Sequence, residues 1–167
     1  MYRSRLGKNL GKITLDYVSS LNDDVEIALY DILGSQAHVI MLYENKIITK
    51  KEIKKILKGL ESLKKEKFDK KTDSEDIHEL IESLIIKKIG IDVGGKMHTA
   101  RSRNDQVALD IRMKIRDDIN IVCQCLLDTI KSLVVLAKKH QETIIPLYTH
   151  LQQAQVGLFS HYLLSYA

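Results

Sequence analysis

The sequence DQVALDIRMKIRDDINIVCQCLLDTIKSLVVLAKKHQETII, residues 105–145, decides the fold class. Its apolar residues recur at intervals of three and four, the spacing that places side chains on one stripe of an α-helix. The spacing predicts a helix over 105–145, which at 1.5 Å per residue would be roughly 55–60 Å long. Such a helix is too long to be buried in a compact domain of this size, so we expect an elongated bundle whose other helices cover the stripe.

The segments on either side of this helix are also predicted to be helical. Residues 23–43 show the same apolar recurrence, with Gly34 and Ser35 placed where they would kink the helix or allow close packing. Pro146 is expected to end the long helix, because proline has no backbone N–H to donate. A further helical pattern starts at His150 and is still running at the last residue, which predicts a truncation inside a helix.

Two capping signals mark the starts of the remaining helices. Thr49 and Glu52 have the spacing of a capping box, in which each side chain accepts a hydrogen bond from the other residue's backbone N–H. This box predicts the start of an amphipathic helix with a lysine-rich face. Thr72 and Glu75 repeat the spacing and predict a third helix, which Gly90 ends.

The composition agrees with a mostly helical globular chain. The 167 residues are 44% hydrophobic and 29% charged, and they include one proline and eight glycines. Such a composition argues against long disordered regions. The fold class is therefore predicted to be all-α, with an N-terminal helical domain over 1–104 and the beginning of a long-helix bundle domain over 105–167, truncated at its end.

The positive charge does not by itself predict nucleic-acid binding. The formal net charge is +4, and the excess comes largely from residues 46–71, a lysine-rich stretch that also contains acidic residues. A solvated helix face explains this mixture. Arg101 and Arg103 together with the lysine-rich helix leave a nucleic-acid binder open as an alternative, but the sequence has no interleaved aromatic platform and no binding motif.

Cysteine usage and hydropathy predict a cytoplasmic protein. Cys123 and Cys125 lie two apart on the long helix, so their side chains diverge and are expected to stay reduced. The first residues lack the apolar run of a secretory signal. No later run approaches the ~20 apolar residues that cross a bilayer, so no membrane association is expected.

Two polar clusters carry the functional prediction. Residues 94–106, GGKMHTARSRNDQ, place two arginines, a histidine and an asparagine at the start of the long helix. Backbone amides at a helix N-terminus carry partial positive charge, so this segment suits carboxylates or phosphate. A second cluster, YTHLQQAQ, follows at 148–155. Together they predict an enzyme that acts on a small polycarboxylate.

The same clusters resemble a known enzyme family. The sequences SEDIH at 74–78, GGKMHTARSRNDQ at 94–106 and YTHLQ at 148–152 occur in the order found in argininosuccinate lyase, a member of the fumarase/aspartase superfamily. The segments at 1–7 and 31–38 also resemble the N-terminal region of that family. The resemblance therefore extends over essentially the whole chain, as an N-terminal portion of the family.

The resemblance implies a reaction and an assembly. Argininosuccinate lyase eliminates fumarate from argininosuccinate to give L-arginine, the last step of arginine biosynthesis, with no metal and no organic cofactor. Family members are homotetramers whose active sites form where three subunits meet on a twenty-helix bundle. They are more than twice as long as this chain and carry a flexible loop with a catalytic serine and a lysine, which this sequence lacks.

Site residues are carried over from the family motifs by position. His150 is predicted to be the catalytic residue, because an imidazole titrates near neutrality and can exchange a proton or orient a water that does. Thr149 and Asn104 are expected to contact the substrate. Ser102 and Arg103 are expected to line the same loop, so all three residues of this loop are predicted to bind substrate.

Three further residues are predicted to bind substrate. Ser20 and Asp24 match family positions at the arginine end of the substrate, where a carboxylate can accept from a guanidinium group. His78 is the other recurrent histidine of the family and is given a supporting role. The alternatives are that Ser20 and Asp24 are an ordinary helix start, and that the loop arginines pair with Glu75 and Glu79.

The sequence departs from the family pattern near the predicted catalytic residue. Leu147 stands where the family has glycine, and Val156 with Gly157 stands where it has proline. Leucine cannot adopt every backbone conformation open to glycine, so we expect an effect on the turn that aims His150. The alternative function is therefore a catalytically inactive helical interaction or structural fragment of the same superfamily.

Overall fold

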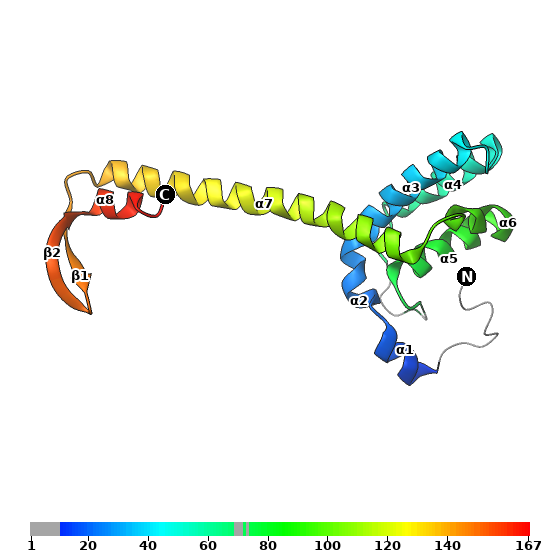
Figure 1. Cartoon of the computed structure of the whole chain (residues 1–167), viewed down its shortest axis with the longest axis horizontal. Coiled ribbons are helices and arrows are strands. Elements are labelled where there is room, and N and C mark those ends of the chain that lie inside the picture. The colour runs from blue at the N-terminus through cyan, green and yellow to red at the C-terminus, as the bar shows by residue number, and fades with distance from the viewer. Residues whose placement is uncertain (1–10, 69–71, 73) are drawn as a thin grey trace. The chain divides into compact units, whose positions relative to one another are not determined.

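A computed structural model of the chain describes residues 11–68, 72 and 74–167 (Figure 1). The chain divides into two compact units, which we call unit 1, up to Lys114, and unit 2, Ile115–Ala167. The division falls inside the long helix α7 (Arg103–Lys139). The resemblance noted at 1–7 lies outside the described residues, and the domain boundary predicted at 104/105 stays a prediction.

Unit 1 is a packed helical body. Helices α3, α4 and α5 pack on one another, and buried aliphatic side chains fill the space between them. The predicted helix over 23–43 is present, with one 3-10 turn interrupting its first residues. The elements are α1 (Lys12–Val18), α2 (Leu21–Asp24), η2 (Val25–Ile27), α3 (Ala28–Glu44), α4 (Lys50–Leu63), α5 (Ile77–Ile89), α6 (Ile91–Gly94), η3 (Gly95–His98) and the first turns of α7.

The start of α4 is confirmed as a capping box. The Thr49 hydroxyl accepts from the Glu52 backbone N–H at 3.3 Å, and the Glu52 carboxylate accepts from the Thr49 N–H at 2.7 Å. Lys96 also pairs with Glu52 at 2.5 Å. The hydrogen bonds from Lys96 and Thr49 lower the pKa of Glu52 to about 2, so this cap stays charged at neutral pH.

The start predicted for α5 was wrong by four residues. The helix is capped by Asp76, whose carboxylate accepts from the Glu79 N–H at 2.6 Å, while Glu79 accepts from the Glu75 N–H at 2.8 Å. The spacing of Thr72 and Glu75 matched a capping box, but Asp76 is the residue with the extended backbone that a cap requires. Gly90, with φ of 87°, ends α5 as predicted.

Unit 2 contains a β-hairpin that the sequence did not predict. Helix α7 ends at Lys139 rather than at 145, and strands β1 (Ile144–Thr149) and β2 (Gln152–Leu158) pair antiparallel before α8 (Phe159–Leu164). The helix predicted from His150 was therefore wrong. The run Thr143-Ile144-Ile145-Pro146 is β-branched and lacks one N–H donor, both of which favour extended backbone over helix. The all-α class is confirmed apart from this small sheet.

The two departures from the family pattern meet across the hairpin. The register pairs Ile145 with Gly157 and Leu147 with Gln155. A Cβ added to Gly157 would lie 2.8 Å from Leu147 Cδ1, so the leucine side chain covers the glycine. Leu147 itself has no positive φ, but the register of the hairpin shifts between Leu147 and Tyr148. The positive φ angles of this hairpin are at its turn residues, His150 and Leu151.

The surface of α7 is apolar along much of its length. Ile115 to Leu136 includes many exposed aliphatic side chains, such as Ile121 at 63% and Leu127 at 60%. The expectation that no segment is apolar enough to cross a membrane was wrong by length and composition alone, because Leu21–Glu44 and α7 both meet that criterion. The first of these contributes to the core of unit 1, and core helices of soluble proteins meet the same criterion.

Candidate functional site

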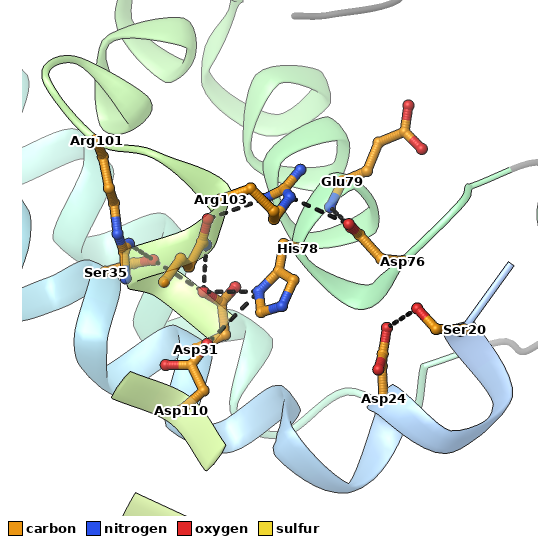
Figure 2. A network of polar contacts seen from close by, with 11 residues as sticks. Ser20, Asp24, Asp31, Ser35, Asp76, His78, Glu79, Arg101, Arg103 and Asp110 are labelled. Carbon is orange, nitrogen blue, oxygen red and sulfur yellow. Dashed lines mark hydrogen bonds and ion pairs between the residues drawn. The ribbon is translucent and has the colours of Figure 1, made fainter. Parts of the chain in front are cut away.

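A buried polar cluster joins three helices of unit 1 (Figure 2). His78 of α5 places its Nδ1 atom 3.2 Å from Asp31 Oδ1 of α3 and 3.5 Å from Asp110 Oδ2 of α7. All three side chains are buried. Three titratable groups so close together in an apolar core form the principal polar feature of this unit, and charge and hydrogen bonding must compensate for their burial.

A glycine lets α7 reach this cluster. A Cβ added to Gly34 would lie 3.2 Å from Leu109 Cδ2 and 3.3 Å from Asp110 Oδ1, tighter than ordinary contact. The absence of a side chain at Gly34 therefore permits the close packing that the sequence left open, and α3 continues through this residue. Asp110 and Asp31 are brought into one cluster by this approach.

The two carboxylates have opposite pKa shifts. Burial raises the pKa of Asp31, but the hydrogen bond and charge of His78, with Gln106 and Arg101, lower it below its ordinary value overall. Burial and the negative charge of Asp31 raise the pKa of Asp110 to about 7. Like charges in one site disfavour double ionisation, so Asp31 is the charged member and Asp110 is the one that holds a proton most readily.

The arginines of the loop pair within the chain. Arg103 Nε lies 3.1 Å from Asp76 Oδ2, and its Nη1 donates to Gln106 Oε1 at 2.8 Å. Arg101 Nη1 donates to the Ser35 hydroxyl at 2.9 Å. Among the described residues, Arg103 thus contacts the cap of α5 and Gln106, and Arg101 contacts Ser35.

The exposed edge of this network is the start of α7. Ser102 and Asn104 are exposed, and the Ser102 hydroxyl accepts from the Asn104 backbone N–H at 3.2 Å. Asp105 accepts from the Ser102 N–H at 2.9 Å. Next to them Arg103 is half-buried, so a cationic side chain and exposed polar groups stand together at the start of a helix 37 residues long. Such a helix start attracts anions.

Ser20 and Asp24, which were predicted to bind the substrate, contact each other. Ser20 donates its hydroxyl hydrogen to Asp24 Oδ2 at 2.5 Å (Figure 2). The Ser20 N–H donates to the Glu75 carbonyl at 3.0 Å, so the pair lies beside the residues that lead into α5. Ser20 also precedes α2, but its hydroxyl makes no cap hydrogen bond there. Ser20 is the N-cap residue of α2, and a contact with Asp24 four residues on fits both interpretations, so the role of the pair in substrate binding stays a prediction.

Two further residues of the predicted site, Thr149 and His150, lie in unit 2. Thr149 ends β1, and His150 occupies the two-residue turn that leads into β2. Both side chains are exposed. His150 and Leu151 have φ angles of 47° and 63°, in the left-handed region that is costly for side chains other than glycine. Backbone strain of this kind clusters at functional sites.

Comparison with known proteins identifies the family. Residues 11–167 match the family described as Lyase. The chain belongs to this lyase family. It is 72% identical over 167 residues to the argininosuccinate lyase of Nitrosopumilus maritimus, and 48% identical to that of Methanocaldococcus jannaschii. These alignments cover 100% and 98% of the chain and 34% of each relative, so the chain spans about a third of their length.

A solved structure agrees with the family assignment. The crystal structure of EDDS lyase in complex with formate matches with a TM-score of 0.71 and 29% identity, over 90% of this chain and 30% of that chain. The resemblance to argininosuccinate lyase, as an N-terminal portion, is thereby confirmed. The roles assigned to individual residues stay predictions.

The buried cluster of this lyase chain was missed by sequence reasoning, apart from His78. That histidine, predicted to bind substrate, is only 2% exposed and lies between two carboxylates. Asp31, Gln106 and Asp110 were not predicted as site residues. The signal for Asp31 was a polar residue inside an apolar stripe: it lies three residues after Ala28, which is buried on the same face of the helix.

The cluster has the spacing of a metal site, but its donors do not suit a cation. Ligand atoms of Asp31, His78 and Asp110 lie within 4.8 Å of one another. However, Asp31 Oδ1 already accepts a hydrogen bond from Gln106 Nε2, which occupies this oxygen. The positive charge of Arg101 also acts on Asp31. The arrangement therefore fits protons better than a metal ion.

Proposed function

We propose that the chain is the N-terminal portion of an argininosuccinate lyase, which eliminates fumarate from argininosuccinate and releases L-arginine. The observation that carries this proposal is the 72% identity, over the whole chain, to the argininosuccinate lyase of Nitrosopumilus maritimus. The reaction requires no metal or organic cofactor in this proposal, because side chains can supply both the proton transfers and the stabilising charge.

The start of α7 is suited to the charge that this reaction develops. Removing a proton from the carbon beside a carboxylate creates a dianionic aci-carboxylate, which needs fixed donors and cations. Arg103 supplies a cation, and Asn104 and Ser102 supply exposed polar groups at a helix N-terminus. We assign these three residues to the carboxylates of the succinate moiety.

We assign the remaining predicted residues to proton transfer and to binding of the arginine moiety. His150 would exchange a proton during the elimination or orient a water that does so, with Thr149 beside it on the substrate. Asp24, which Ser20 holds at 2.5 Å, would accept from the guanidinium or ammonium group of the arginine moiety. His78 supports the site from inside the core.

The proposal includes an assembly and a location. The exposed aliphatic side chains of α7 support association of chains through this helix, and a homotetramer of the full-length protein is the proposed assembly. An enzyme of arginine biosynthesis acts on soluble metabolites, so we propose a cytoplasmic protein that binds neither membrane nor nucleic acid.

Fumarate release, followed by ultraviolet absorbance, tests the proposal. The chain is assayed alone, mixed with a full-length Nitrosopumilus relative whose histidine at the His150 position is replaced, and fused to the remaining two thirds of that relative. We expect activity in the fusion and in the mixture. The matched control is the fusion with His150→Asn, in which the rate should fall by about 10²-fold or more.

The outcomes separate the two functions that the sequence left open. An active fusion that loses activity with His150→Asn supports the lyase. A fusion that is folded by circular dichroism but releases no fumarate would favour the inactive structural fragment. Activity of the 167 residues alone would mean that the missing two thirds are not needed for the chemistry.

A further inference from the structure

Gln106 joins the proposed site to the buried cluster. Its side chain is 2% exposed. Nε2 donates to Asp31 Oδ1 on one side, and Oε1 accepts from Arg103 Nη1 at 2.8 Å on the other. Figure 2 labels Asp31 and Arg103, the residues at the two ends of this connection. A buried residue thus links a core carboxylate to Arg103, the first residue of α7.

Asp31 and Arg103 place opposite hydrogen-bonding requirements on the side chain between them. A carboxylate at Asp31 can only accept hydrogen bonds, and the guanidinium of Arg103 can only donate them. A side chain that contacts both must therefore donate at one end and accept at the other. The amide of Gln106 does so, and its orientation is determined by these two partners.

Asp31 and Arg103, the two partners of Gln106, each make further contacts. Asp31 is contacted by His78 at 3.2 Å and by the Ser35 hydroxyl at 3.5 Å. Arg103 is held a second time by Asp76 at 3.1 Å. The contacts that the described residues make with Arg103 use two of its five N–H donors, so others are left for a ligand.

We propose that Gln106 is a positioning residue for Arg103. It transmits the fixed position of Asp31 in the core to the guanidinium at the start of α7, so that Arg103 presents its remaining donors to a substrate carboxylate without rearrangement. This inference rests on the proposed lyase function. Preorganised donors of this kind act on substrate binding and on the charge developed in the transition state.

The first test is Gln106→Glu in the fusion with the remaining two thirds of the relative. The glutamate has the same size, but its ionised form cannot donate to Asp31 and is repelled by that carboxylate. The side chain at 106 then moves away from Asp31, and Arg103, which pairs with it, is displaced. We expect the KM for argininosuccinate to rise about tenfold, the effect of losing one charge-assisted hydrogen bond. Partial unfolding would instead lower the apparent kcat at unchanged KM, so the two effects are separable.

The second test exchanges donor and acceptor. In the double variant Asp31→Asn with Gln106→Glu, the amide stands at 31 and the carboxylate at 106. The amide can donate to the carboxylate, and the carboxylate can accept from Arg103, so both contacts are restored at the net charge of the parent. We expect the KM to return to within about threefold of the parent. A double variant no better than Gln106→Glu alone overturns the proposal.

A third variant covers the case in which the double variant does not fold. Gln106→Met keeps the length of the side chain and removes both hydrogen bonds without adding a charge. We expect a rise in KM of about fivefold in a protein that is still folded by thermal unfolding. A KM within about twofold of the parent for this variant overturns the positioning role.

The two proposals fail in different ways. If the parent fusion is folded and releases no fumarate, the lyase function fails and this inference fails with it. If the parent is active and the KM is unmoved by both Gln106→Glu and Gln106→Met, the lyase function stands and only the role of Gln106 is lost.

Discussion

Units 1 and 2 both contain helices with an apolar stripe, but the two units differ in how much of that stripe neighbouring side chains cover. In unit 1, Ile32, Ile56 and Leu60 are fully buried against neighbouring helices. In unit 2, Ala137 and Leu163 are the only apolar residues buried among those that the structure describes. The difference teaches that unit 1 completes its core within this chain, whereas the apolar stripe of α7 needs a surface from elsewhere.

The largest expected effect tests this difference directly. Ile56→Ala in unit 1 should lower the free energy of unfolding by about 2–5 kcal/mol, because the fully buried side chain leaves a cavity. Ile121→Ala in unit 2, where the side chain is 63% exposed, should change it by less than about 0.5 kcal/mol. Urea unfolding of the 167-residue chain, followed by circular dichroism, measures both. Equal losses would show that the α7 stripe is already covered.

A smaller effect concerns the polar interior of unit 1. The pKa of Asp110 is raised to about 7 by burial and by Asp31, whereas in the unfolded chain it is near 3.9. Between these values the folded state binds a proton that the unfolded state does not, so stability falls as the pH rises through this window. Asp110→Asn removes this loss of stability, because asparagine does not titrate.

We therefore expect Asp110→Asn to be more stable than the parent by about 1–2 kcal/mol at about pH 8, and the difference to shrink at about pH 5. Urea unfolding of both proteins at the two pH values checks this. The parent measured beside the variant is the control, because the other titrating groups are common to both. A variant that is less stable than the parent at the higher pH would contradict the assignment of the raised pKa to Asp110.

The smallest effect concerns the turn of unit 2. Leu151 is 99% exposed with φ of 63°, so Leu151→Gly should remove backbone strain and stabilise the hairpin by about 1 kcal/mol. Amide hydrogen exchange across β1 and β2 measures the gain. Val156→Gly is the matched control, because it removes an exposed side chain from extended backbone and should weaken protection. A loss of protection with Leu151→Gly would mean that Leu151 contributes contacts of its own.

Local features of the fold were predictable from sequence. The capping box of Thr49 and Glu52, the glycine stop at Gly90 and most of α7 depend on residues a few positions apart, and all three were confirmed. The hairpin was missed because the apolar spacing after His150 fits a helix as well as a strand. Only its pairing with Ile144–Thr149 settles the conformation.

The sequence by itself determined the helical class, the family and the loop that carries Arg103, since these lie in short runs with local signals. Only the tertiary structure decided that Asp31, His78 and Asp110 share one buried cluster. The physical reason is that pKa shifts and hydrogen bonds depend on distances between helices. No spacing along the chain encodes these distances, because packing, including the close approach at Gly34, sets them.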